Sequence, residues 1–113
     1  MIDEKSIEIL RQKFANLINY ESGDILDPID PLTYVAPDGD TCLHVAAFRG
    51  DEEAVTLLLD AGLDIDATGD MGCTPLHYAF MGKHFAVAAL LIERGASEDV
   101  VNGFGKTPRE MTT

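Results

Sequence analysis

The pattern of apolar and polar positions divides the chain into short amphipathic helices separated by turns. Over residues 3–20 the apolar side chains recur three and four positions apart, which is one face of an amphipathic helix. They are Ile7, Leu10, Phe14, Leu17 and Ile18. Gly23 lies shortly beyond them and suits the left-handed residue that caps a helix. The sequence therefore predicts an N-terminal helix over residues 3–20.

The helical spacing is lost over residues 24–37, where prolines follow Asp27, Asp30 and Ala36. Proline removes a backbone donor and biases the residue before it away from helix, so this segment is expected to be an extended connector. It still carries apolar residues: Ile25, Leu26, Ile29, Leu32, Tyr34 and Val35. We therefore expect the connector to pack against the body of the protein.

Four further helices are predicted between residues 41 and 93. They span about 41–48, 52–61, 74–81 and 84–93. The second and fourth carry dense runs of apolar residues, and each is followed by a glycine, Gly62 or Gly95. Glycine is favoured just past a helix end because the backbone there usually adopts a positive φ.

The same motif recurs along this region with a fixed period. Thr74-Pro75-Leu76-His77-Tyr78-Ala79 follows Thr41-Cys42-Leu43-His44-Val45-Ala46 after 33 residues, and Thr107-Pro108-Arg109-Glu110 follows after the same interval. Gly39, Gly72 and Gly105 each stand two residues before these threonines. A period of about 33 residues carrying T-P-L-H-x-A is typical of ankyrin-type arrays. Residues 39–113 thus resemble the ankyrin repeat family.

The resemblance implies an all-α solenoid of stacked helix pairs, with loops that project from one edge. The expected organisation is an N-terminal capping helix and connector (1–36), followed by ankyrin repeats over 37–113. The repeats would span 38–70 and 71–103, with a partial third over 104–113. The polar, short third unit suits a C-terminal cap. The alternative is that the chain is a fragment of a longer array.

Two departures from the family pattern concern the turns and loops. Lys83 stands where the family prefers a glycine between the two helices of a repeat, so a shifted or strained turn is expected there. Gly69 and Asn102 stand where an aspartate usually braces the loop. The loop conformations are therefore the part of the resemblance that the sequence predicts least well.

Composition narrows the range of partners. The 20 acidic residues outnumber the 8 basic ones, giving a formal charge of −12. Such a surface repels nucleic acid and anionic membranes and favours a basic protein partner, although excess charge also serves simply to keep a protein soluble. The sequence shows no secretory signal and no apolar run long enough to span a bilayer. We therefore expect a cytoplasmic protein with reduced thiols at Cys42 and Cys73.

The histidines and cysteines can be interpreted without catalysis. His44 and His77 occupy the same repeat position, and the resemblance implies that they join adjacent turns through hydrogen bonds. Their spacing relative to Cys42 and Cys73 does not match the usual pairs of zinc ligands. No phosphate-binding glycine loop or paired catalytic carboxylates are recognised. We expect no enzyme activity, no metal and no cofactor.

The expected function is non-catalytic binding of another protein through loop tips and first helices. The positions that the resemblance implies for partner contact combine acidic loop residues, apolar anchors and two basic residues: Asp38, Asp40, Asp70; Phe48, Met71, Met81, Phe104; Arg49 and Lys106. Alternatively, the loop acids are merely solvated and Phe48 packs against the connector. Size and charge are also typical of an inhibitor or immunity-type protein. A monomer is expected when free; the alternative function is a structural, self-associating repeat subunit.

Overall fold

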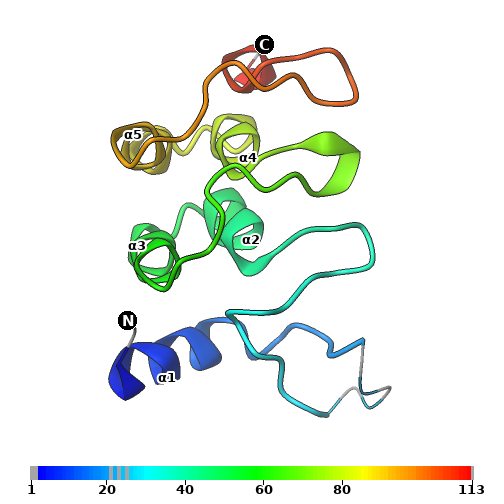
Figure 1. Cartoon of the computed structure of the whole chain (residues 1–113), viewed down its shortest axis with the longest axis vertical. Coiled ribbons are helices and arrows are strands. Elements are labelled where there is room, and N and C mark those ends of the chain that lie inside the picture. Colours follow the sequence, from blue (N-terminus) through cyan, green and yellow to red (C-terminus); the bar gives the residue numbers. More distant parts are fainter. Residues whose placement is uncertain (1–2, 21, 23, 25, 113) are drawn as a thin grey trace.

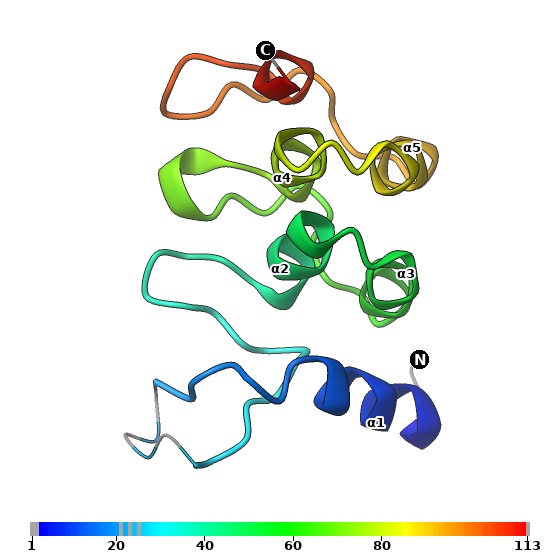
Figure 2. The ribbon, with the colours of Figure 1, turned by 180° about the vertical axis from the view of Figure 1, so that it is seen from behind.

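The helix pairs form one linear stack that follows the order of the sequence. The computed structural model describes residues 3–20, 22, 24 and 26–112. The stack measures 38 × 27 × 20 Å. Figure 1 shows an outer row of helices containing α3 (Glu52–Asp60) and α5 (Phe85–Glu93). The inner row contains α2 (Cys42–Arg49) and α4 (Pro75–Met81) and lies between the outer row and the projecting loops, as the reverse view in Figure 2 also shows. The all-α solenoid expected from the sequence is confirmed.

Hydrogen bonds between threonine and histidine fix the start of each inner helix. Thr41 and Thr74 have extended backbones and cap α2 and α4, and each forms a capping box with the histidine three residues later. In the outer row, Asp51 caps α3 by accepting a hydrogen bond from the amide of Ala54. These caps explain why the helix limits lie within a residue or two of those predicted.

The N-terminal helix is shorter than predicted. α1 spans Glu4–Lys13, and Phe14 already leaves helical geometry. The guanidinium of Arg49 donates hydrogen bonds to the carbonyl of Lys13 and to the side chain of Asn16, so contacts with α2 satisfy this end of α1. The prediction of a helix as far as residue 20 was therefore wrong. Its proposed cap, Gly23, lies outside the described residues.

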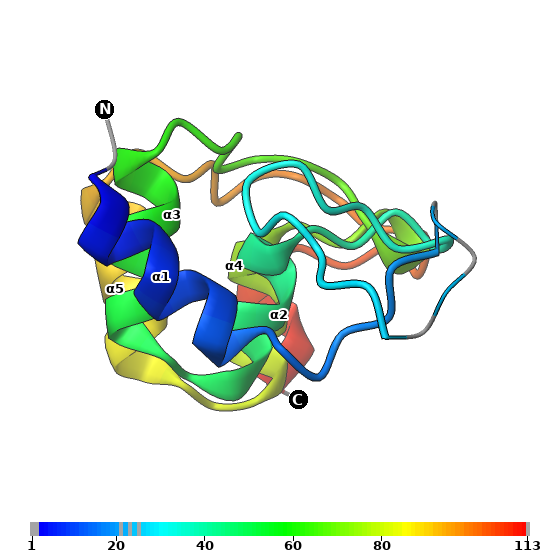
Figure 3. The ribbon, with the colours of Figure 1, turned by 90° about the horizontal axis from the view of Figure 1, so that it is seen from below.

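α1 packs against α3 at the N-terminal end of the stack, as Figure 3 shows from below. Leu10 and Phe14 are fully buried in the core, and the amine of Lys13 bonds the carboxylates of Asp51 and Glu53 at 2.9 and 3.2 Å. The expected covering of the first repeat is therefore observed. The domain boundaries drawn from the sequence remain a prediction.

The connector packs against the body only in part. Ile29 and Pro31 are buried, and Val35 pairs with Thr41 through an isolated antiparallel bridge. The side chain of Val35 is nevertheless exposed, and Leu26 is 86% exposed. Ile25 lies outside the described residues. The apolar pattern therefore overestimated the burial of this segment.

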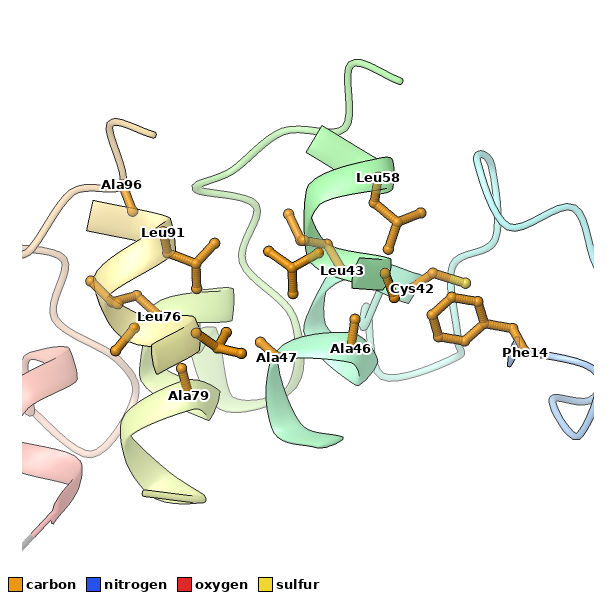
Figure 4. Close-up of a cluster of buried hydrophobic side chains, with 14 of the residues drawn as sticks. Phe14, Cys42, Leu43, Ala46, Ala47, Leu58, Leu76, Ala79, Leu91 and Ala96 are labelled. Atoms are coloured by element: carbon orange, nitrogen blue, oxygen red, sulfur yellow. The ribbon is translucent and has the colours of Figure 1, made fainter. Parts of the chain in front are cut away.

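A single apolar core runs through the stack. Figure 4 shows Leu43 and Ala47 on α2 facing Leu76 and Ala79 on α4, with Ala46 on the side of Cys42 and Phe14, and with Leu58 and Leu91 contributed by the outer row. The alanines keep the inner helices close to one another. Burying this surface is what stabilises each pair, since a repeat covers its apolar face only against its neighbours.

The start of the third repeat forms a 3₁₀ helix, η2 (Pro108–Thr112), which packs on α4. Here Glu110 replaces the histidine of the motif, and its carboxylate accepts hydrogen bonds from both the amide and the hydroxyl of Thr107. The short helical turn expected from the sequence is thus present, in the tighter 3₁₀ form.

Candidate functional site

A groove opens between the two inner helices, on the side that faces the loops. It has a volume of about 320 Å³ and is open to solvent. Its lining is mostly apolar and comes from α2, α4 and the loop before α2: Asp40, His44, Val45, Phe48, Arg49, Tyr78 and Met81. Pockets that enclose a cofactor usually range from about 300 to 1,000 Å³. This groove is at the lower limit of that range and open to solvent, so it would enclose little of a cofactor and is better suited to one or two side chains of a larger partner.

Tyr78 forms one wall of the groove and is held in place by an acid from the preceding repeat. Its hydroxyl donates to the two carboxylate oxygens of Asp40, at 3.1 and 3.0 Å. Its ring meets His44 and Phe48 edge-on, with ring centroids 5.6 and 6.0 Å apart. Burial and the neighbouring Asp40 carboxylate raise the pKa of Tyr78 well above its ordinary value, so the hydroxyl remains protonated and continues to donate.

The same carboxylate braces the loop of the second repeat. Oδ1 of Asp40 accepts a hydrogen bond of 2.9 Å from the amide of Asp70. A Cβ atom at Gly69 would lie only 2.1 Å from this oxygen, which explains why the usual aspartate is absent there. In the third loop Asn102 acts as the brace, because its side-chain oxygen accepts from the amides of Phe104 and Lys106.

The structure brings four of the nine predicted contact residues to the groove: Asp40, Phe48, Arg49 and Met81. Phe48 is 52% exposed and contacts Tyr78, so the alternative in which it packs against the connector is not supported. Arg49 is only partly available, because it bonds residues 13 and 16 and lies over the ring of Phe14.

The remaining five lie on the loops beyond the groove. Asp38 and Asp70 are exposed at the first and second loops, and Met71 is 48% exposed. Met71 also has a φ of 55°, a left-handed conformation that a methionine rarely adopts. In the third loop Phe104 is 61% exposed, while Lys106 is partly buried.

Sequence reasoning missed Val45 and Tyr78, although the repeat period could have identified them. Val45 and Tyr78 are equivalent positions of the two repeats, as are Phe48 and Met81. Within each inner helix these residues are three apart, so they lie on one face. The double role of Asp40 had no comparable signal, because it depends on contacts across 30 and 38 residues.

The two histidines join adjacent turns, as expected from the resemblance. Nδ1 of His44 accepts from the amide of Thr41, while Nε2 lies 2.8 and 3.1 Å from the carbonyls of Ala67 and Cys73. His77 makes the same local bond to Thr74 and reaches the carbonyl of Lys106. Burial lowers the pKa of His77, which favours the neutral ring. Both imidazoles are therefore structural.

The thiols and acids offer little for metal or nucleophilic chemistry. Burial raises the pKa of Cys42 to about 12 and also raises that of Cys73, so both thiols stay protonated. Among the described residues, no cluster of three His, Cys, Asp or Glu side chains is placed to hold a metal ion.

Charge pairing leaves the loop acids without basic partners. In the described part of the chain, ion pairs join Glu8, Asp51, Glu53, Asp60 and Glu98 to lysine or arginine, and none includes Asp38, Asp40 or Asp70. Asp40 in the groove and Asp38 and Asp70 on the adjoining loops are therefore free to form an ion pair with a partner.

Comparison with known proteins agrees with this architecture. A family model described as ankyrin repeats (3 copies) matches residues 8–102. The chain belongs to the ankyrin repeat family. The match begins within α1, which the sequence analysis had placed outside the resemblance.

Curated relatives share the repeats over part of their length. An ankyrin and IPT/TIG repeat-containing protein of Schizosaccharomyces pombe is 33% identical over 75% of this chain and 7% of its own. Protein phosphatase 1 regulatory subunit 27 of Homo sapiens is 36% identical over 71% of this chain and 52% of its own. Diacylglycerol kinase iota of Homo sapiens is 36% identical over 79% of this chain and 9% of its own. The chain thus spans about half the length of these relatives, or much less.

The family defines a class of activity. Ankyrin repeats bind other proteins and are typically non-catalytic, and the kinase relative matches this chain over only a small share of its length. No helix in the described ranges combines the length and apolar character needed to cross a bilayer.

Proposed function

We propose that this chain is a non-catalytic binding module that holds a basic protein partner against its loops and inner helices. The observation that carries the proposal is the apolar groove between α2 and α4, which Asp40 lines and which the loops of Asp38 and Asp70 adjoin; none of these three acids forms an ion pair within the described chain. Apolar anchors surrounded by polar contacts are typical of protein interfaces. A negative border would also speed the encounter with a positive partner.

The proposed contact surface comprises the nine predicted residues and two further residues that line the groove, Val45 and Tyr78. In this proposal Phe48 and Met81 contribute apolar contact area, while Asp38 and Asp70 contribute charge. Arg49 acts mainly by shaping the surface, because its side chain is already bonded within the molecule. Asp40 both holds Tyr78 and the second loop in place and adds its charge to the surface.

The proposal also includes a cytoplasmic location and a monomeric free state. The free, buried thiols of Cys42 and Cys73 are consistent with a reducing compartment. A formal charge of −12 opposes pairing of two copies through the same acidic face. An inhibitor or immunity-type role would be a special case, in which the bound partner is a basic toxin or nuclease.

Affinity capture from a native lysate tests the proposal. Immobilised wild-type chain is compared with the variant Asp38→Lys, Asp70→Lys, Phe104→Ala, and captured proteins are identified by mass spectrometry. We expect a basic protein that binds wild type in a one-to-one complex and is lost by the variant. Circular dichroism confirms that the variant is folded.

The matched control is Asp64→Lys, Asp99→Lys, Val101→Ala. It makes the same change of charge and removes a similarly exposed apolar side chain, but its aspartates lie on the connections that follow α3 and α5. The control should retain the partner. Equal capture by all three chains would mean that the contact surface lies elsewhere.

A further inference from the structure

We infer that the groove between α2 and α4 is a subsite for one bulky apolar side chain of the partner, with a lysine or arginine of the same partner segment placed over the loop acids. This inference rests on the proposed function and specifies the chemistry of its ligand. The subsite is defined by Val45, Phe48, Tyr78 and Met81, and its charged end by Asp38, Asp40 and Asp70.

The apolar part of the subsite is prepared for a ligand. Phe48 and Met81 are 52% and 38% exposed, so contact with a partner would remove apolar surface from water. Tyr78 cannot easily turn away, because its hydroxyl is bonded to Asp40 and its ring lies against two other rings. A wall that is already fixed loses little conformational freedom on binding, which favours affinity.

The two ends of the groove differ in charge because of the direction in which α2 runs. This helix begins at Cys42, next to the loop that carries Asp38 and Asp40, and ends at Arg49. One end of the groove is therefore acidic, whereas the other end holds a guanidinium that is bonded to the end of α1. A cation on the ligand is attracted to the loop end and repelled from the other end, so the apolar and basic groups must enter in one orientation.

Asp40 gives the charged end its strength. Its carboxylate is partly buried beside apolar side chains, where the effective dielectric is lower than in water. Oδ1 accepts from Tyr78 and the amide of Asp70, while within the described part of the chain Oδ2 accepts from the Tyr78 hydroxyl alone. An ammonium or guanidinium of the ligand would meet an oxygen with remaining acceptor capacity.

Other occupants agree less well with these features. A second copy of the chain would bring the same acidic loops to the same surface, and nucleic acid would bring phosphates. A neutral apolar segment would fill the groove but leave Asp38, Asp40 and Asp70 without cations. A segment that combines one large apolar residue with a nearby lysine or arginine satisfies both requirements.

Panning a phage-displayed random peptide library against the chain of residues 1–113 tests the inference. The double variant Phe48→Ala, Met81→Ala serves for counter-selection, and Leu26→Ala, Val101→Ala is the matched control on exposed apolar residues outside the proposed contact surface. We expect enriched peptides that share a large apolar residue and a lysine or arginine within a few positions. Their affinity should fall about thirtyfold or more in the groove variant and change little in the control.

Each part of the motif is then removed in a synthetic peptide made from the enriched sequence. Replacing its apolar residue with alanine, or its basic residue with glutamate, should each abolish measurable binding. Enrichment of peptides that lack either feature, equal binding to the groove variant, or no enrichment at all would overturn the inference.

The natural partner separates this inference from the proposed function. Capture that is lost with Asp38→Lys, Asp70→Lys but unchanged with Phe48→Ala, Met81→Ala would leave the proposed function intact and contradict the subsite. Capture unaffected by both variants would contradict the proposed function itself.

Discussion

At the residue scale, the turns between the two helices of each repeat both contain a residue with a left-handed backbone, a glycine in the first repeat and a lysine in the second. Gly50 has a φ of 74° between α2 and α3, and Lys83 has a φ of 58° between α4 and α5. A Cβ atom at Gly50 would lie 2.5 Å from the ring of His84, so glycine is required there for space as well as for conformation. The strain that the sequence suggested at Lys83 is confirmed by its positive φ.

These turns predict opposite effects of substitution. Gly50→Ala should lower the free energy of unfolding by about 2 kcal/mol, because it adds a clash to an unfavourable backbone. Lys83→Gly should raise it by about 0.5 to 1 kcal/mol, since relief of the left-handed conformation exceeds the entropy cost of glycine. Urea unfolding of both variants measures these changes. A destabilised Lys83→Gly variant would contradict this account of the turn.

The hydroxyl of Tyr78 offers a second residue-scale prediction. Tyr78→Phe keeps the ring but removes both bonds to Asp40, and should lower the free energy of unfolding by about 1 kcal/mol. Tyr34→Phe is the control: this tyrosine is also partly buried, but it lies in the connector and outside the groove. If Tyr78→Phe left stability unchanged in urea unfolding, the bond would not brace the two repeats.

At the element scale, the attachment of α1 depends on the contacts of Lys13. Burial raises the pKa of Asp51, but the hydrogen bonds from Lys13 and from the amide of Ala54 outweigh it, so the pKa lies below its ordinary value. A carboxylate with a lowered pKa contributes stability above the pKa of the unfolded state, near 3.9, and loses that contribution as the pH falls through the folded value. The bridge should therefore stabilise α1 at neutral pH and fail in acid.

Lys13→Met tests this attachment. At neutral pH it should lower the free energy of unfolding by about 0.5 to 1 kcal/mol, a modest loss because both partners are about one-quarter exposed. The difference from wild type should shrink as the pH falls below about 4. Urea unfolding across this pH range, with Lys5→Met as the control, measures both effects. A difference that is independent of pH would exclude the ion pair as its cause.

The elements could be predicted from the sequence where their signals are local. The threonine–histidine caps and the glycines after α3 and α5 lie within a few residues of the helices they limit. The positions of α2, α3, α4 and α5 could therefore be predicted from the sequence. The end of α1 could not be predicted, because Arg49 sets it from 36 residues away. The groove was half predicted: Phe48 and Met81 came from family positions, whereas the link from Asp40 to Tyr78 exists only after two repeats have stacked.

At the scale of the whole molecule, an excess of 12 negative charges should control how the partner approaches. Electrostatic attraction raises association rates, and salt screens it over about 8 Å at physiological ionic strength. Raising the salt concentration should therefore slow association with the captured partner several-fold and change dissociation little. Stopped-flow kinetics at several salt concentrations measure both rates. If salt changed the dissociation rate more than the association rate, steering by the acidic surface would be contradicted.

The measurement that tests the central claim most directly is an NMR titration of the isotope-labelled chain with the captured partner. The proposed surface predicts that the largest amide shifts lie in α2, α4 and the loops around Asp38, Asp70 and Phe104. The outward-facing residues of α3 and α5 should change little. Shifts concentrated on α3 and α5, or on the connector at residues 24–37, would contradict the assignment of the groove and loops as the contact surface.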